Sequence, residues 1–541
     1  MKKQDWSRAI HGFGPLFSLL ILVIAAVTNS CGGGTSGGGG SGPPPPTVTV
    51  LTQHNDNSRT GLNAQETTLT VAKVNSATFG KLFAQPVDGL IVGQSLYVPQ
   101  VSIPGLGKHN VVYVATQHDS VYAFDADSNA GANASPLWSV SFLNAAAGVT
   151  TVPIVEQGCG PTTKFTEVGI LSTPVIDTTS GTIYILAKTK ENGAYVHRLH
   201  ALDITAGTEK FGGPVVISAS VNGKLRTINF DNLSQMGRPG LLLLNGAVYL
   251  SFGSNGCDGG ATGPPHGWVL SYDAHTLQQT AVFNASPDDA EGRNAIWQAG
   301  GGPAADASGN IYFETANGPF DADSGGRDYG DSFVKISKIA SGFSVLDYFT
   351  PYNQLALRAN DLDLGSSGLM LLPDQAGAHP HLTVGSGKQG SIYVVDRDNM
   401  GHYNPVDNSQ IVQFLDRAAG RGFSVPAYWN STVYIAGQAQ GLQAFSVNNG
   451  LLTLASQSGP ICCFQVPSIS ANGTTDGIVW ILNANTLVAL DAKDLTHRLY
   501  DTNQAGGRDT LGTTAHFHVP TVANGKVYVG TDMQLVVLGL L

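Results

Sequence analysis

Residues 111–127 read VVYVATQHDSVYAFDAD, and this pattern recurs along nearly the whole chain. It predicts a strand, a short turn, and a second strand that ends at an aspartate. Related copies lie at 182–203, 247–273, 310–337, 391–398, 432–446, 478–491 and 526–540. Eight repeats, each with several short strands, predict an all-β, eight-bladed β-propeller of four-stranded antiparallel blades.

Each repeat carries one aromatic residue that marks its position, and these markers are Tyr113, Tyr184, Tyr249, Tyr312, Tyr393, Tyr434, Trp480 and Tyr528. The last four markers are 41, 46 and 48 residues apart, the length of one four-stranded blade. The earlier markers are 63 to 81 residues apart, and the excess lies in the stretches 143–166, 285–299 and 319–330. We expect these stretches to form loops on one face of the ring.

The eighth repeat ends after three strands, because the chain stops at residue 541. The segment FGKLFAQPV, residues 79–87, is expected to supply the missing outer strand of the last blade. Pairing the start of the propeller with its end would close the ring and leave no open edge. We therefore expect a single propeller domain over residues 47–541.

The N-terminal segment predicts export. A mostly basic start precedes the short apolar run 15–27, which has the length of a signal-peptide core, so residues 1–30 are interpreted as a signal peptide. Cys31 directly follows and resembles the lipidated cysteine of bacterial lipoproteins, although Thr28 and Asn29 depart from that motif; plain secretion and a retained anchor are the alternatives. Residues 31–46, rich in Gly, Ser and Pro, are expected to be a tether. The expected location is the periplasm or cell surface, with a membrane anchor through Cys31.

The composition limits the classes of partner. Only 12% of the residues are charged, there are 67 glycines, and the net charge is −11. Such an acidic chain repels phosphate backbones, which argues against binding nucleic acid. It also disfavours direct contact with anionic lipid surfaces. We expect a monomer that contacts an envelope protein or a polysaccharide.

Four further cysteines are Cys159, Cys257, Cys462 and Cys463. An even number outside the cytosol predicts disulfides, and four cysteines allow three pairings. We favour Cys159–Cys257 together with a bond between the adjacent Cys462 and Cys463. Four buried free thiols are the alternative.

The stretches VYVATQHDSVYAFDAD…PLW and VALDAKDLTHRLY resemble the repeats of the quinoprotein alcohol dehydrogenase-like propellers, the PQQ repeat family. The resemblance spans roughly residues 79–541 and implies that Trp138 docks onto the next blade. The family contains PQQ-dependent dehydrogenases as well as non-enzymatic propellers, among them lipoprotein scaffolds of outer-membrane protein assembly, so the fold does not decide the activity.

If the chain is a dehydrogenase, the resemblance implies PQQ and a cation such as calcium, bound by carboxylate and amide oxygens, with an aspartate as base. In the family a tryptophan lies under the cofactor and a vicinal disulfide lies over it. Here the vicinal pair Cys462–Cys463 falls later in the chain than in the family's alcohol dehydrogenases, so we interpret it as a loop closure. The sequence identifies no matching set of Glu, Asn and Asp, and it contains no Cys-x-x-Cys-His haem motif.

Three groups of residues are candidates for a site. The acidic loop FDADSGGRDYGD, residues 320–331, offers Asp321, Asp323 and Asp328 to a calcium ion, although it departs from an EF-hand and a solvated turn is the alternative. His516 and His518 alternate in AHFHVP, so on a strand they would share one face near the channel mouth. Turns at strand ends carry the remaining candidate ligand contacts, His118, Arg238, Asn255, His266 and Asn317.

Three functions are therefore open. The first is an exported, lipid-anchored propeller that binds a partner without catalysis. The second is a divergent PQQ-dependent dehydrogenase that oxidises alcohols or sugars. The third is another propeller enzyme, such as a lyase or hydrolase, that uses the histidines and acids of the channel.

Overall fold

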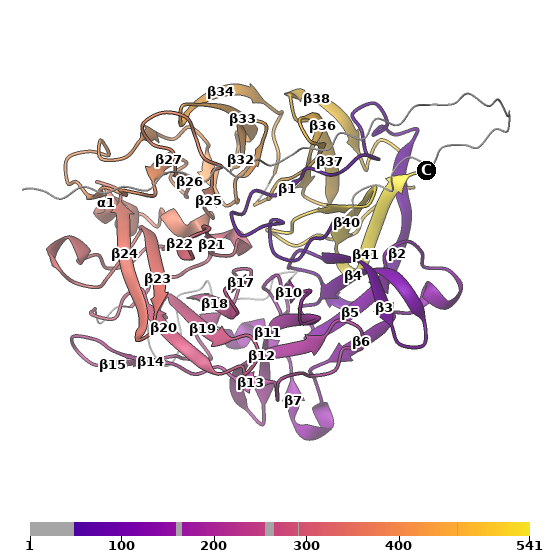
Figure 1. The fold of residues 1–541 in the computed structure, drawn as a ribbon, viewed down its shortest axis with the longest axis horizontal. Coiled ribbons are helices and arrows are strands. Elements are labelled where there is room, and N and C mark those ends of the chain that lie inside the picture. The colour runs from indigo at the N-terminus through magenta and orange to yellow at the C-terminus, as the bar shows by residue number, and fades with distance from the viewer. Residues whose placement is uncertain (1–47, 158–164, 255–264, 290–291, 463) are drawn as a thin grey trace, which may run out of the picture. The chain divides into compact units, whose positions relative to one another are not determined.

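Eight small antiparallel sheets follow one another along the chain in the computed structural model, which describes residues 48–157, 165–254, 265–289, 292–462 and 464–541 (Figure 1). Blades 1 to 4 consist, from the inner strand outward, of β3 (Leu96–Ile103), β4 (Gly107–Ala115), β5 (Ser120–Asp125) and β6 (Trp138–Ser141); β10 (Val175–Asp177), β11 (Thr182–Glu191), β12 (Ala194–Asp203) and β13 (Val215–Val216); β17 (Leu242–Leu244), β18 (Ala247–Ser254), β19 (Trp268–Asp273) and β20 (Gln279–Asn284); and β21 (Ala304–Ala305), β22 (Asn310–Glu314), β23 (Phe333–Ile339) and β24 (Gly342–Thr350).

The second half of the chain repeats the arrangement. Blades 5 to 8 consist of β25 (Met370–Leu371), β26 (Leu382–Ser386), β27 (Ile392–Asp396) and β29 (Gln413–Leu415); β31 (Ala427–Trp429), β32 (Thr432–Gln438), β33 (Gly441–Asn448) and β34 (Leu451–Gln457); β35 (Ser468–Asn472), β36 (Thr475–Asn483), β37 (Thr486–Asp491) and β38 (Asp494–Asp501); and β39 (Thr521–Ala523), β40 (Lys526–Gly530), β41 (Asp532–Leu540) and β2 (Phe79–Leu90). The predicted eight-bladed, all-β propeller is confirmed.

Strand β2 closes the ring as predicted. It pairs antiparallel with β41, with Phe79 opposite Leu540 and Gln85 opposite Leu535. In Figure 1 the indigo β2 lies beside the yellow β41 near the C-terminus. The strand that begins the ring therefore completes its last blade, and both ends of the sheet series are paired.

The repeated tyrosine and aspartate join neighbouring blades. The hydroxyl of Tyr184 donates to the carbonyl of Ala274, the residue that follows the aspartate of the next blade. The same contact joins Tyr113 to Ile204, Tyr434 to Ala492 and, across the closure, Tyr528 to Ala126. Trp138 docks onto the second blade as expected, because its indole N–H donates to the carbonyl of Ile204. Each such hydrogen bond contributes about 1 kcal/mol, while the burial of the ring contributes more.

The long connections gather at one end of the channel. Adjacent strands of a blade are antiparallel, so the connection from its second to its third strand and the connection from its fourth strand to the next blade lie at the same end. The described parts of the stretches 143–166 and 285–299, and the whole of 319–330, belong to these connections. We call this end the loop face. The one α-helix of the described residues, α1 (Gln354–Ala359), also lies in such a connection.

The N-terminal strap, residues 50–63, runs along the inner strands of all eight blades. Its first contact is between Val50 and Tyr97 of blade 1, and its last is between Asn63 and Val522 of blade 8. Between them the strap hydrogen-bonds with Ile176, Leu243, Ala305, Leu371, Tyr428 and Ile469, one residue in each of the intervening blades. The eight blade residues that contact the strap occupy equivalent positions. In seven blades this residue comes directly after the inner-strand residue that pairs with the marker aromatic. In blade 5 it comes directly after the inner-strand residue that pairs with the equivalent position of the second strand.

Arg59 fixes the middle of this strap. Its side chain is fully buried and donates to the carbonyl of Pro303 at 2.8 and 3.1 Å and to the carbonyl of Gln53 at 2.8 Å. Burial lowers the pKa of Arg59 to about 10, with nearby Asp56 opposing that shift. The strap therefore runs along the inner strands with its buried side-chain polar groups hydrogen-bonded. In the part of the chain that the structure describes, no helix is long and apolar enough to cross a bilayer.

Candidate functional site

A cluster of aromatic rings surrounds the channel mouth on the loop face. Phe423, Phe464 and Phe517 each lie a few residues ahead of an inner strand, and their rings are half-buried. Phe464 contacts Phe423 at 4.4 Å and Phe517 at 6.0 Å between ring centroids. Phe464 and Phe517 both adopt a left-handed backbone, with φ of 58° and 65°. Bulky residues rarely take this conformation, which concentrates at functional sites.

Arg238 lies over this cluster. Its guanidinium carbon is 5.2 Å from the centroid of the Phe517 ring. Its one hydrogen-bond partner is the sulfur of Met236 at 3.8 Å, and no acidic side chain of the described residues pairs with it. Burial alone lowers the pKa of Arg238 to about 10. The sequence prediction that Arg238 lies at one end of the channel agrees with this position.

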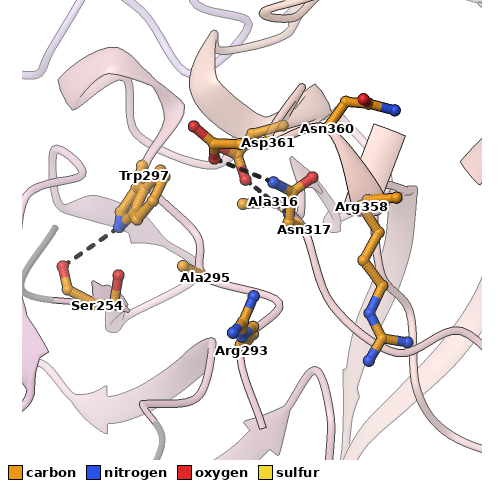
Figure 2. A pocket seen from close by; sticks show the side chains of 11 residues that line it. Ser254, Arg293, Ala295, Trp297, Ala316, Asn317, Arg358, Asn360 and Asp361 are labelled. Carbon is orange, nitrogen blue, oxygen red and sulfur yellow. Dashed lines mark hydrogen bonds between the residues drawn. The ribbon is translucent and has the colours of Figure 1, made fainter. Parts of the chain in front are cut away.

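A pocket of about 450 Å³ opens on the loop face between blades 3, 4 and 5 (Figure 2). Trp297 and Ser254 lie on one side of it, Arg358 lies on the other, and Asn317 and Asp361 lie between them. Arg293 extends from below in this view. The pocket combines an aromatic wall with two guanidinium groups, two side-chain amides and two carboxylates, which are groups that orient a polar ligand.

Trp297 is held in place by the neighbouring blade. Its indole N–H donates to the carbonyl of Ser254 at 3.3 Å. Its ring lies against the backbone of Gly253, where a Cβ would come within 1.9 Å of the ring. The position of this indole therefore requires glycine at 253.

The polar side of the pocket is a network around Lys388. The ammonium of Lys388 forms ion pairs with Asp361, at 2.9 Å, and with the buried Asp363. The side-chain amide of Asn317 donates to Asp361 at 3.3 Å, while its carbonyl oxygen is buried without a hydrogen-bond partner. Burial raises the pKa of Asp363, and the charge of Lys388 opposes that shift.

Two more carboxyl groups lie buried near the loop face, at the ends of second strands and in the turns that follow them. Glu314 is fully buried and neither of its oxygens has a hydrogen-bond partner. Asp119, which follows β4, is also fully buried, and neither of its carboxyl oxygens has a hydrogen-bond partner. Burial raises the pKa of both groups well above their usual values, so each keeps its proton to higher pH than a free carboxyl group.

The structure separates the remaining predicted ligand residues. His118 pairs with Glu167 at 2.9 Å near the first blade. His266 is buried against Ser286, and burial lowers its pKa to about 4. Asn255 lies outside the described residues. Arg238, Asn317 and His516 are the predicted residues that lie at the mouth or in the pocket.

His516 and His518 do not share a strand face. Residues 516–517 form a turn, and β39 begins at Thr521. His516 packs on Phe464 at 4.9 Å between ring centroids, whereas His518 is buried and its Nε2 accepts from the N–H of Gly530. Burial lowers the pKa of His518 to about 4. The alternation predicted a strand, but the left-handed backbone of Phe517 turns the chain between the two histidines.

The acidic loop is folded on itself. Asp321 accepts from the backbone N–H of Asp328 at 2.9 Å, and Asp323 is exposed. Burial, with the charges of Asp321 and Asp288, raises the pKa of Asp328 to about 6. Within the described residues no group of three or more His, Cys, Asp or Glu is placed to hold a metal ion. A calcium ion in this loop stays a prediction.

The cysteine predictions fall largely outside the described residues. Cys31, Cys159, Cys257 and Cys463 all lie there, as do the signal peptide and the tether. Cys462 is exposed, and its backbone N–H donates to Asn483 at 2.8 Å. Both pairings, and the lipid on Cys31, therefore stay predictions.

Sequence reasoning missed Trp297, Asp361, Asp363 and Lys388 as site residues. Trp297 stands in AIWQAGGGP, directly ahead of an inner strand, where glycines allow a close approach of the backbone. Lys388 stands in the short turn SGKQG between two strands. A tryptophan at the loop-face start of an inner strand was the available signal, whereas the contact of Lys388 with residues 361 and 363 depends on tertiary packing.

Comparison with known proteins supports the fold. No family model matches the sequence, and no curated protein is similar to it. Among solved structures, a quinohemoprotein alcohol dehydrogenase from Pseudomonas putida HK5 is similar, with 13% identity, a TM-score of 0.61, and coverage of 91% of this chain and 80% of the other. The enzyme of the same kind from Comamonas testosteroni gives 14% identity, a TM-score of 0.60, and coverage of 91% and 80%.

A europium-containing methanol dehydrogenase is also similar, with 13% identity, a TM-score of 0.56, and coverage of 91% of this chain and 98% of the other. The fold is that of the PQQ dehydrogenase propellers. Identities this low establish the arrangement of the blades and leave the activity to be argued from the site.

Proposed function

We propose that this chain is an exported, lipid-anchored β-propeller that binds an envelope polysaccharide at its loop face without catalysis. The observation that carries the proposal is the pocket of about 450 Å³ lined by Trp297, Asn317 and Arg358. A concave pocket of this size takes a small unit, such as one or two sugar rings, better than a flat protein surface. The half-buried indole of Trp297 offers an apolar face on which a sugar ring packs, and the polar groups around it match hydroxyl groups.

The acids of this region support binding rather than acid–base chemistry. Asp361 and Asp363 are already engaged by Lys388, and Glu314 is buried away from solvent. A general acid or base must reach the proton that it transfers. In this arrangement the ion pairs stabilise the pocket and orient its wall.

The second candidate is a PQQ-dependent dehydrogenase, and the pocket gives it one specific argument. Trp297 offers a flat surface for the quinone, and Asn317 has an unpartnered buried carbonyl oxygen beside Asp361. A bound cofactor would supply the redox chemistry. The cation that should accompany it fits poorly, because the ammonium of Lys388 already lies between the two carboxylates that would hold it. We therefore derive no catalytic step for this chain.

One set of measurements separates the two candidates. Binding of an acidic polysaccharide (alginate) and a neutral one (dextran) is measured by calorimetry with the wild type and with Trp297→Ala. We expect either polymer to bind the wild type and to lose at least tenfold in affinity with the variant, while Trp429→Phe, a change in another blade, retains binding. No binding of either polymer would contradict the polysaccharide proposal.

The same protein is incubated with PQQ and calcium. We expect no marked rise in the melting temperature and no reduction of an artificial dye with alcohols or sugars. Stabilisation follows mass action, so a tightly bound cofactor would raise the melting temperature by several degrees. Such a rise together with dye reduction would establish the dehydrogenase and overturn the proposal of a non-catalytic binding protein.

A further inference from the structure

A second pocket, of about 520 Å³, opens between blades 4 and 5 on the face opposite the loop face. The turns between the first and second strands of both blades line it, and in antiparallel blades these turns lie at the end away from the loop face. Ser58 and Thr60 of the strap complete the lining. The pocket shares no residue with the pocket of Figure 2, so the two are separate sites.

Two cations, Lys335 on β23 and Arg397 directly after β27, line this pocket. Nζ of Lys335 and the guanidinium carbon of Arg397 lie 5.7 and 5.8 Å from the centroid of the same ring, that of Tyr312. The ammonium of Lys335 also donates to the backbone carbonyl of Arg397 at 2.7 Å. The fold therefore holds two positive charges close to one another, and an anion beside both would relieve their repulsion.

Both cations keep donors that the described residues do not use. The side chain of Arg397 is 9% exposed, and its Nε donates to the carbonyl of Leu382 at 3.2 Å. Its nearest carboxylate, Asp306, is 3.8 Å from Nη1, beyond hydrogen-bond range, and already accepts four hydrogen bonds from residues 308–312. Lys335 makes one hydrogen bond and no ion pair with the described residues.

A structural lysine of the same propeller is treated differently. Lys188 is buried, and all three of its donors are used. It donates to Oε1 of Gln157 at 2.7 Å and to the carbonyl groups of Leu233 and Gln235 at 3.0 and 2.9 Å. Lys335 retains two donors at a pocket, which indicates an acceptor that comes from outside the chain.

Exposed carboxylates line the same pocket. Nδ1 of His381 lies 2.7 Å from Asp398, and its Nε2 lies 3.8 Å from Asp374. The side chains of Asp398 and Asp374 are 58% and 77% exposed, so both keep oxygens for a further donor. A pocket that combines cations with open donors and carboxylates with open oxygens is complementary to a ligand that carries both charges.

We propose that this pocket binds a zwitterion, a short peptide whose ammonium and carboxylate termini are both free. Lys335 and Arg397 hold the carboxylate through charge-assisted hydrogen bonds, and Asp374 and Asp398 hold the ammonium. Pockets of this size enclose molecules larger than a single amino acid. The site does not depend on the polysaccharide proposal, because the two pockets have no residue in common.

The test uses trialanine as the probe, with N-acetyl-trialanine and trialanine amide as counterparts that each lack one charge. Binding to the wild-type protein is measured by calorimetry. We expect trialanine to bind and each capped peptide to lose at least about tenfold in affinity. No binding of trialanine, or equal affinity for either capped peptide, would overturn the zwitterion site.

Lys335→Met tests the cation and should lower the affinity for trialanine by about tenfold or more, with a melting temperature near that of the wild type. Lys338→Met, on the same strand but outside the pocket, is the matched control and should retain binding. Asp398→Asn should weaken the binding of trialanine and leave that of N-acetyl-trialanine unchanged, because the acetylated peptide has no ammonium. A lower melting temperature of Lys335→Met with unchanged affinity would show that the lysine is structural, and an equal effect of Asp398→Asn on both peptides would remove the ammonium from its place; either result would overturn the proposal.

Discussion

The strap and the loop face treat polar groups in opposite ways. The strap hydrogen-bonds with every blade, and none of its buried side-chain atoms, all of which lie in the described residues, lacks a partner. At the loop face Glu314, Asp119 and the carbonyl oxygen of Asn317 are buried without partners, and Arg238 faces only a sulfur and a ring. Buried polar groups that stabilise a fold usually have all of their hydrogen-bond partners. Groups left unsatisfied at an opening indicate a place where a ligand binds.

This difference also explains what each region contributes. The strap supplies hydrogen-bond partners along the inner edges of all eight blades, so it contributes to the stability of the fold. The loop face instead leaves charged and polar groups unpaired, at a cost to stability, whereas left-handed backbone occurs in both regions, at Arg59 in the strap and at Phe517 at the mouth. Variants in the two regions should therefore change the free energy of unfolding in opposite directions.

The largest expected effect comes from deleting residues 79–87, most of β2. The deletion removes the outer strand of blade 8 and exposes the edge of β41. We expect the variant to aggregate or to show no cooperative melting by circular dichroism. Deletion of the exposed turn 376–378 is the control and should leave melting cooperative. A soluble β2 variant with wild-type melting would refute closure by this strand.

Replacement of Arg59 by methionine should lower the free energy of unfolding by about 2–4 kcal/mol, since several carbonyl groups lose a buried donor. Urea denaturation measures the change. Arg421→Met, which removes an exposed arginine, should change it by no more than about 0.5 kcal/mol. An equal effect of both variants would mean that the strap contributes no special stability.

Glu314→Gln should reduce the loss in the free energy of unfolding that occurs as the pH rises. Burial raises the pKa of Glu314 well above its usual value of 4.5, so the folded protein keeps this proton where the unfolded chain has lost it. The stability it contributes is complete below about pH 4.5 and is lost as the pH rises toward the folded-state pKa. Between pH 5 and pH 8 the wild type should therefore lose more stability than the variant.

Urea denaturation at the two pH values measures this difference. Asp323→Asn, an exposed carboxyl on the same face, should leave the pH dependence unchanged. If the free energy of unfolding changed equally with pH in the wild type and in Glu314→Gln, Glu314 would be hydrated or paired in solution.

The smallest expected effect compares two joints between blades. Tyr528→Phe removes the hydroxyl that donates from blade 8 to Ala126 of blade 1, and Tyr184→Phe removes its equivalent between blades 2 and 3. Each should cost about 1 kcal/mol in urea denaturation. A much smaller cost for Tyr528 would show that the closure is looser than the other joints.

The fold could be predicted from the sequence because its signals are local and repeated. The marker tyrosine and the terminal aspartate recur since each blade must contact the next in the same way. The closure by residues 79–87 followed from the missing strand of the last repeat. The strap was not predicted, because residues 50–63 show no periodicity and their order comes from backbone contacts with all eight blades.

The site could be predicted only in part. Arg238 and Asn317 were expected at one end of the channel because they stand in turns at strand ends, and His516 was expected at the channel mouth because it precedes an inner strand. His266 stands in a similar turn and His518 precedes the same inner strand as His516, yet both are buried with lowered pKa values. Sequence position gives the end of the channel but not the direction of a side chain, so the network of Asp361, Asp363 and Lys388 became visible only in the structure.

The most direct measurement is the free energy of unfolding of Arg59→Met and Arg238→Met, determined side by side in urea without added ligand. We expect a loss of several kcal/mol for the strap arginine and no loss, or a gain, for the arginine at the channel mouth. A comparable loss in both variants would contradict the distinction between a structural strap and a loop face that binds a ligand.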